Sequence, residues 1–218
     1  MSKISLKHSG GNVVSLNSPT SAPTSSDVAF KLPNADGSAN QFLKTDGSGN
    51  LSFGAVTSPK VLQVVSQTKT DTASNSTASN TWWSYTDSSL IATLTPSSAS
   101  NKILLMAQIS FSEATGHWYM ARFEQDGAEL AGVIGDASSN RIRTTLFIDN
   151  QADNNAGRTV SMIAQASAGN TNSRYYNIAL RHTSGISRTI NINKTGNDGD
   201  QYSYGRAIST ITAMEIEA

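Results

Sequence analysis

The fold class follows from the stretch HWYMARFE at residues 117–124, in which apolar and polar side chains alternate. In an extended chain the two sets face opposite sides, with Tyr119, Ala121 and Phe123 on one and Met120, Arg122 and Glu124 on the other. A period of two residues is typical of a β-strand with one face in a core, whereas a helix needs a period of about 3.6. The stretch therefore predicts a half-buried β-strand.

Alternating or strongly apolar runs recur on both sides of this strand, from about residue 60 onward. They are Val61–Gln67, Trp82–Thr86, Leu90–Leu94, Ile103–Ser112, Ile142–Ile148, Val160–Ala166, Tyr176–Leu180, Ile190–Ile192 and Ile208–Ile216. Loops rich in Asn, Asp and Gly separate several of them, as at 149–157 and 194–201. About ten short strands without a helical pattern predict an all-β fold, with an antiparallel, jelly-roll-like β-sandwich as the head domain over residues 59–218.

The first 29 residues differ in composition from this head and are rich in Ser, Thr, Asn and Pro. Their apolar residues come in small groups, Ile4 with Leu6 and then Val13, Val14 and Leu16. Such groups suffice for a short extended strand but not for a core. Residues 1–29 are therefore predicted to be an extended attachment segment that lies on a sister chain or on another protein.

Residues 30–58 are predicted to be a short β-hairpin linker between this segment and the head. Within them FKLPNADGSANQFLKTDGSGNLSF, residues 30–53, contains two Asp-Gly turns, Asp36-Gly37 and Asp46-Gly47. Asp-Gly supplies the positive φ that a tight hairpin needs. A hairpin of this size is marginal alone. Because identical copies could bury each other's apolar anchors around an axis, the sequence predicts a homotrimer.

Composition excludes several classes of function. Charged residues make up 15% of the chain, apolar residues 37%, and the formal net charge is zero, without any basic run that would bind nucleic acid. Cysteine is absent, which excludes disulfides and thiolate metal sites. The longest apolar run, Ile103–Ala107, is far too short to span a membrane, and the N-terminus lacks the apolar core of a secretory signal. We expect no membrane insertion, no cofactor, and an unprocessed chain made in a cytoplasm.

Catalytic motifs are also missing from the sequence. His8, His117 and His182 are far apart, and a histidine on a strand edge is usually polar surface. Five carboxylates could in principle supply a glycosidase pair, namely Glu113, Asp126, Glu129, Asp136 and Asp149, although Asp126 and Asp136 adjoin glycines and resemble turns. We therefore expect no enzyme activity, with a glycan depolymerase as the weaker alternative.

Two Asx-rich loops could in principle hold calcium. One contains Asp149, Asp153 and Asn155, and the other contains Asn197, Asp198 and Asp200. Neither has the spacing of an EF-hand loop, and Asx-rich turns explain both. No metal site is predicted.

Aromatic side chains occur in adjacent or near-adjacent pairs and are the candidates for glycan binding. The candidate residues are Trp82, Trp83, Trp118, Tyr202 and Tyr204. The apolar face of a sugar ring stacks on an aromatic ring. Neighbouring residues of a strand face opposite sides, so about half of these rings should be exposed or should line a subunit interface.

Three stretches together resemble the fibre proteins of tailed bacteriophages. Residues 32–53 resemble a linker near the N-terminus of phage tail-fibre and other virion appendage proteins. SLIATLTPSSASNKILLMAQISF, residues 89–111, and the end of the chain, residues 188–218, are similar to the first and last parts of the jelly-roll head of marine and cyanobacterial phage fibres. The resemblance implies a homotrimer in the virion, with an N-terminal attachment region and a distal head.

Two functions of different classes remain open at this point. One is a trimeric tail fibre whose head binds a host-surface receptor, through a glycan site built from the aromatic residues. The other is a purely structural component, a capsid-decorating fibre or adaptor without a receptor. Exposed aromatic rings at the tip of the head would favour the first, and polar tips would favour the second.

Overall fold

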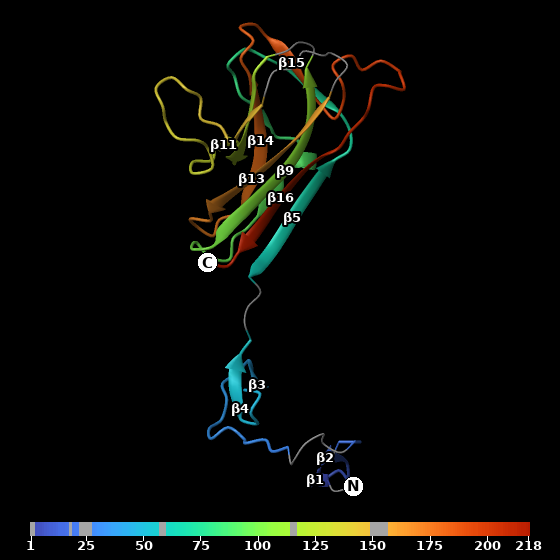
Figure 1. Cartoon of the computed structure of the whole chain (residues 1–218), viewed down its shortest axis with the longest axis vertical. Helices are drawn as coiled ribbons and strands as arrows, with labels where there is room; N and C mark the ends of the chain where they lie inside the picture. The colour runs from blue at the N-terminus through green and yellow to red at the C-terminus, as the bar shows by residue number, and fades with distance from the viewer. Residues whose placement is uncertain (1–2, 18, 22–27, 57–59, 114–116, 149–156) are drawn as a thin grey trace. The chain divides into compact units, whose positions relative to one another are not determined.

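The computed structural model describes residues 3–17, 19–21, 28–56, 60–113, 117–148 and 157–218. The chain divides into two compact units, Met1–Ser58 and Pro59–Ala218 (Figure 1). Apart from the short 3-10 turn η1 (Ser88–Leu90), every regular element described is a β-strand, which confirms the predicted all-β class.

The segment expected to be singly extended contains a hairpin. β1 (Lys3–Lys7) pairs antiparallel with β2 (Val13–Asn17). Gly11 has a φ of +93° in the connecting turn, and the Gly10 N–H donates to His8 Nδ1 at 3.0 Å. The turn thus supplies a pairing partner that the apolar pattern did not reveal. Ile4 and Leu6 nevertheless remain 68% and 70% exposed.

The linker forms one hairpin, β3 (Gln41–Thr45) with β4 (Leu51–Ala55). Its turn begins at Asp46, whose carboxylate accepts the Asn50 side-chain N–H and the Ser48 and Asn50 backbone N–H groups, which lowers the pKa of Asp46. Gly37 does not have the positive φ of the tight turn that was expected at Asp36-Gly37, so that turn is not formed. A glycine is needed at position 37 because of the close approach of Phe53, since a Cβ on Gly37 would lie 2.7 Å from Cγ of Phe53.

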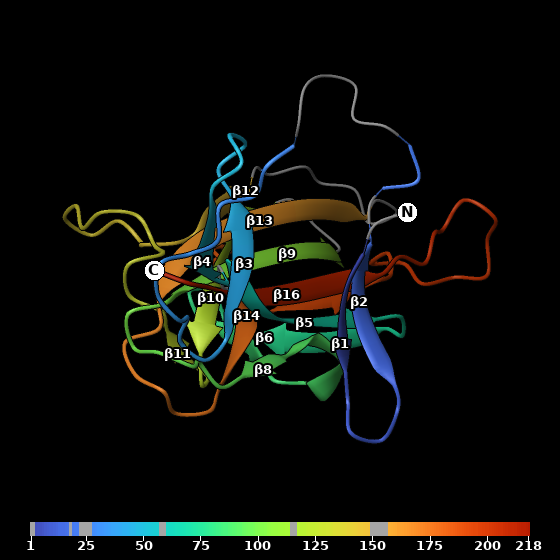
Figure 2. The same cartoon turned by 90° about the horizontal axis from the view of Figure 1, so that it is seen from below.

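Pro59–Ala218 folds into two antiparallel sheets. The first contains β5 (Val61–Lys69), β6 (Ala73–Thr77), β9 (Lys102–Glu113), β13 (Arg158–Ser167), β15 (Arg188–Ile192) and β16 (Ser209–Ile216). The second contains β7 (Trp83–Tyr85), β8 (Ala92–Leu94), β10 (Tyr119–Gln125), β11 (Ala128–Glu129), β12 (Leu146–Ile148) and β14 (Arg174–His182). Figure 2 shows β13, β9, β16 and β5 of the first sheet side by side.

The strand order is that of a jelly roll. The rows of the first sheet run β13, β9, β16 with β15, and β5 with β6, because β15 and β16 pair with successive parts of the same side of β9. The rows of the second sheet run β11 with β12, β10, β14, and β7 with β8. The eight rows can be numbered in the order in which the chain passes through them, from β5 with β6 as row one to β15 with β16 as row eight. Read from the β5 edge, the first sheet then holds rows one, eight, three and six. Read from the edge of β7 and β8, the second sheet holds rows two, seven, four and five. That interleaving is the double Greek key of a jelly-roll sandwich, as the sequence predicted.

Alternate residues of facing strands fill the space between the sheets. The inward residues of β9 and β10 are Ile103, Leu105, Ala107, Ile109, Phe111, Tyr119, Ala121 and Phe123, each at most 5% exposed. β10 therefore buries the face that its period of two predicted, and β9, whose run is strongly apolar, buries one alternate set of its residues. Of the run Ile142–Ile148, only Leu146–Ile148 is a strand, and the residues before it form an irregular connection.

Several charged groups are buried in this chain despite its low charge content, and Glu215 on β16 is fully buried. Its carboxylate accepts hydrogen bonds from Gln63 Nε2 at 2.6 Å, Ser97 N at 2.7 Å and Asn101 Nδ2 at 2.6 Å. Burial alone would raise the pKa of Glu215, but these hydrogen bonds outweigh it and lower the pKa to about 2. The ionised carboxylate thus ties β16 to β5 and to the loop before β9.

This carboxylate should make the stability of the protein depend on pH. Because the pKa of Glu215 is lower in the folded than in the unfolded chain, its contribution is complete above about pH 4.5 and is lost as the pH falls toward about 2. We expect Glu215→Gln to flatten the fall in the urea midpoint over this range. Glu217→Gln, at a neighbouring carboxylate whose side chain is 37% exposed, serves as the control. If the urea midpoint of Glu215→Gln fell with acid as steeply as that of the unaltered protein, Glu215 would not be the group responsible.

Candidate functional site

Adjacent aromatic residues divide between the core and the surface. Tyr119 is 5% exposed and points between the sheets, whereas Trp118, immediately before β10, is 48% exposed. In the same way Trp83 packs beside the core, edge-on to Tyr85 with 5.4 Å between ring centroids. Trp83 is therefore occupied by packing, and Trp118 is available at the surface.

Trp118 forms an exposed stack with Phe147 of β12. The ring centroids lie 5.3 Å apart with an interplanar angle of 28°, and Phe147 is 54% exposed. Phe147 lies directly across from Met120 of β10 in the antiparallel register. Phe147 was not among the predicted binding residues, although it occupies the opposite-facing position between Leu146 and Ile148 in an alternating run. Stacking two rings in this way makes a broad apolar platform.

The platform continues across the sheet through cationic side chains. Met120 also lies across from Arg181 of β14 in the antiparallel register. Because Leu180 of β14 lies across from Trp83 of β7, the preceding residue Trp82 comes beside Arg181. The guanidinium of Arg122 lies 4.3 Å from the centroid of the Trp82 ring, and that of Arg181 lies 5.9 Å from it. Trp82 is thus engaged with arginines rather than open for stacking. We call Trp118, Phe147, Met120, Arg181 and Trp82 the aromatic strip.

The two arginines beside Trp82 differ in their charge balance. Arg122 is paired with Glu124 at 2.8 Å and with Glu129 at 2.6 Å. Arg181 donates from Nη2 to Asn80 Oδ1 at 3.0 Å, while its buried Nε has no hydrogen-bond partner among the described residues. Burial and the nearby Arg122 lower the pKa of Arg181. Within the described part of the chain, Arg181 is the cation of the strip that no carboxylate neutralises.

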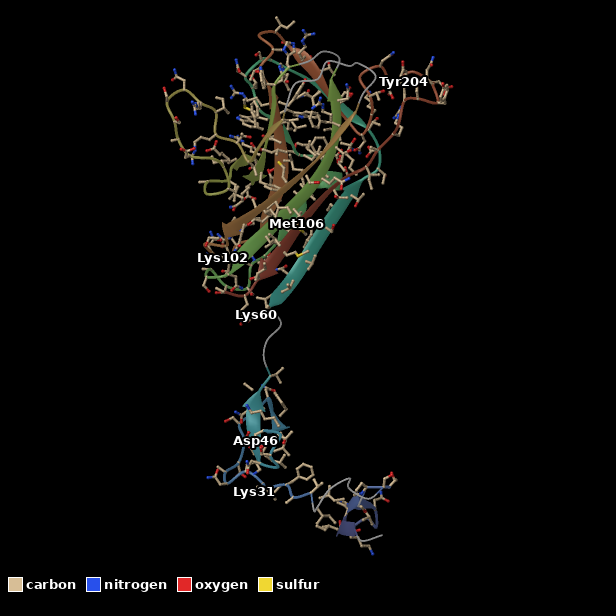
Figure 3. The ribbon with its side chains drawn as sticks, viewed as in Figure 1. Lys31, Asp46, Lys60, Lys102, Met106 and Tyr204 are labelled. Atoms are coloured by element: carbon tan, nitrogen blue, oxygen red, sulfur yellow. The ribbon has the colours of Figure 1, made fainter. Side chains whose placement is uncertain are left out.

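Tyr202 and Tyr204 belong to a different part of the head. They lie in the loop between β15 and β16 of the first sheet, where Figure 3 labels Tyr204. Tyr202 is 105% exposed, and the Tyr204 hydroxyl accepts a hydrogen bond from Asn197 Nδ2 at 3.1 Å. The five predicted aromatic residues therefore do not form one site, because Trp82 and Trp118 share the outer face of the second sheet and the tyrosines do not.

The loops considered for calcium do not supply a metal site in the described residues. The first, with Asp149, Asp153 and Asn155, lies outside them. In the second, Asp198 is paired with Arg206 at 2.8 Å and Lys194 at 3.5 Å, so cationic side chains hold its carboxylate. No group of three or more His, Cys, Asp or Glu side chains that could hold a metal ion occurs in the described ranges, and no helix there is long and apolar enough to cross a membrane.

His182 differs from the surface residue expected of a histidine on a strand edge. It is fully buried at the end of β14, with Nε2 3.1 Å from the Thr77 carbonyl and Nδ1 3.0 Å from Ser184 Oγ. Burial lowers the pKa of His182 and so favours the neutral ring. Since Ser184 Oγ also contacts the Ile186 carbonyl at 2.6 Å, the arrangement anchors the turn between β14 and β15.

Comparison with known proteins gives a likeness at the level of shape alone. No protein family and no curated protein matches the chain. Two chains from structures of infectious bursal disease virus are similar, one from the Gt strain at 11% identity and a TM-score of 0.38, and one from the Gx strain at 12% and 0.36. They align with 91% and 94% of this chain, which spans 47% and 46% of theirs. Because both TM-scores are below 0.5, these likenesses carry no argument about function.

Proposed function

We propose that the chain is a structural protein of a phage virion, a trimeric tail fibre whose head binds a glycan of the host surface through the aromatic strip. The supporting observation is the exposed Trp118–Phe147 stack. It lies at the end of the sandwich remote from Lys60, where the head begins and where Glu217 N–H donates to the Lys60 carbonyl. A binding surface at the free end of a head suits host contact.

The residues of the strip suit a sugar with an acidic group. Two stacked rings offer an apolar face to a sugar ring, and one stacking contact contributes about 1 kcal/mol. Arg181, which has no carboxylate partner in the described residues, can pair with a carboxylate or phosphate of the ligand. Such a site is weak alone, but three copies on one trimer would strengthen adhesion by about 10²–10⁴-fold where their spacing matches the surface.

The assembly that we propose uses Met1–Ser58 for contacts with sister chains and other virion proteins. Among the described residues of this unit, no large apolar side chain is fully buried: Phe30 is 63% exposed and Leu32 is 77% exposed. Covering such side chains with identical copies is the simplest way to remove them from water. A purely structural capsid-decorating fibre would use the same contacts but would not need the exposed stack.

Trp118→Ala should weaken binding of the full-length protein to acidic bacterial surface polysaccharides by about tenfold, because one face of the platform is lost. An array of purified acidic and neutral polysaccharides measures this. Tyr202→Ala is the matched control, since Tyr202 is an exposed ring outside the strip. Both variants should keep the native mass and melting temperature of the unaltered protein.

Three outcomes would contradict the proposal. Absence of binding to every polysaccharide on the array would favour the purely structural fibre. Dissociation or unfolding caused by Trp118→Ala would instead show that the stack lines a subunit contact. If Tyr202→Ala alone abolished binding, the ligand site would be the β15–β16 loop.

A further inference from the structure

The outer face of the first sheet lacks charge from row to row across β13, β9, β16 and β5, and Lys102, at the start of β9, lies at one end of it. Strand register brings its outward side chains together in rows, such as Ile163, Met106, Thr212 and Ser66 across β13, β9, β16 and β5. We call this the uncharged face, and it comprises Val64, Ser66, Thr68, Leu104, Met106, Gln108, Thr159, Ser161, Ile163, Gln165, Thr210, Thr212 and Met214. About a quarter to a third of ordinary surface residues are charged. A solvent-facing sheet would therefore be expected to carry several charges here.

Apolar side chains lie at the centre and both edges of this face. Ile163 on β13 is 69% exposed and Val64 on β5 is 53% exposed. Leu104, Met106 and Met214 lie between them and are partly exposed, and Figure 3 labels Met106 near the middle of β9. Methionine is enriched and charge is depleted at the centres of protein interfaces. The face therefore has the composition of an interface.

The edge of the same sheet adds a second, independent observation. β13 pairs with β9 over its full length and is the end row of the sheet. From Thr159 to Ser167 it contains neither a charged residue nor a proline. Exposed edge strands normally carry such residues, because a bare edge pairs with other chains. An uncharged edge beside an uncharged face indicates that both are covered in the assembled protein.

We infer that the uncharged face and the β13 edge are where heads of identical chains contact one another. Symmetry brings like residues close together near an axis, so a homomeric contact gains most from a face on which no like charges can meet. Four strand rows and about seven residues cover about 440 Å² in projection. A stable contact needs about 800 Å² per partner, and the apolar side chains of Met1–Ser58 can supply the rest. This inference rests on the proposed homomeric assembly and does not depend on the glycan site.

Thiol labelling tests the inference directly, because the natural chain has no cysteine. Ile163→Cys and Ile186→Cys place one thiol each at positions that are 69% and 58% exposed in the single chain. Ile186 lies in the β14–β15 loop, away from the face. In the purified full-length protein we expect maleimide to react with Ile163→Cys at least about tenfold more slowly than with Ile186→Cys. Light scattering should report an oligomer for both.

A charge substitution provides the second arm. Ile163→Lys should weaken self-association by at least about tenfold, because an unpaired ammonium would be buried in the contact, whereas Ile186→Lys should leave it unchanged. Equal labelling rates in an oligomer would overturn the inference and leave assembly through Met1–Ser58 in place. Slow labelling of Ile163→Cys in a monomer would also overturn it, since the chain's own segments would then cover the face.

Discussion

Glu124→Ala is expected to lower the free energy of unfolding by about 3 kcal/mol, because it breaks a buried charge pair and leaves Arg122 with the more exposed Glu129 as its carboxylate partner. Glu124 on β10 is fully buried. Its Oε1 accepts from Arg122 Nε at 3.2 Å and Nη2 at 2.8 Å, and its Oε2 accepts from Asn177 Nδ2 at 3.1 Å. Removing the carboxylate takes an acceptor from fully buried Asn177 and from Arg122, whose side chain is 12% exposed.

Chemical unfolding of the full-length protein would measure this loss. Glu129→Ala is the matched control, because Glu129 pairs with the same arginine at 2.6 Å but its side chain is 43% exposed. We expect the control to cost less than about 1 kcal/mol. Equal losses in the two variants would contradict the buried pair as the stabilising contact. Glu124→Ala should also disturb Trp82, since Arg122 lies over that ring.

Asp87→Ala should be comparably destabilising, costing about 3 kcal/mol. Asp87 accepts from Lys69 Nζ at 3.1 Å, from the Tyr85 hydroxyl at 3.0 Å and from Ser89 N at 2.9 Å, where it caps η1. Hydrogen bonds from Ser89 and Lys69 lower the pKa of Asp87. The side chain of Lys69 is 1% exposed, so losing Asp87 leaves a buried ammonium with fewer partners.

Asp71→Ala separates this effect from simple ion pairing. Asp71 lies closer to Lys69 Nζ, at 2.7 Å, but its side chain is 72% exposed. Solvent weakens such a contact, so we expect a loss below about 1 kcal/mol. Thermal unfolding of both variants at neutral pH compares them, and a larger loss for Asp71→Ala would contradict this account.

Local periodicity predicted most strands of the head and the buried face of β10. The alternation in HWYMARFE predicted that Tyr119, Ala121 and Phe123 face the core, and they do. It did not predict β6, whose sequence ASNST has no large apolar residue. That segment is a strand because β15 offers it a hydrogen-bonding edge. Backbone pairing depends on a neighbour and can occur without an apolar pattern.

The sequence by itself also determined the absence of cysteine, the low charge and the grouping of aromatic residues. Only the tertiary structure decided which rings meet, because Trp118 and Phe147 are brought together by the register of β10 with β12. It likewise decided that Lys69, Glu124 and His182 are buried. Period and composition act within one strand, whereas stacking, burial and charge pairing depend on strands that are distant in the chain.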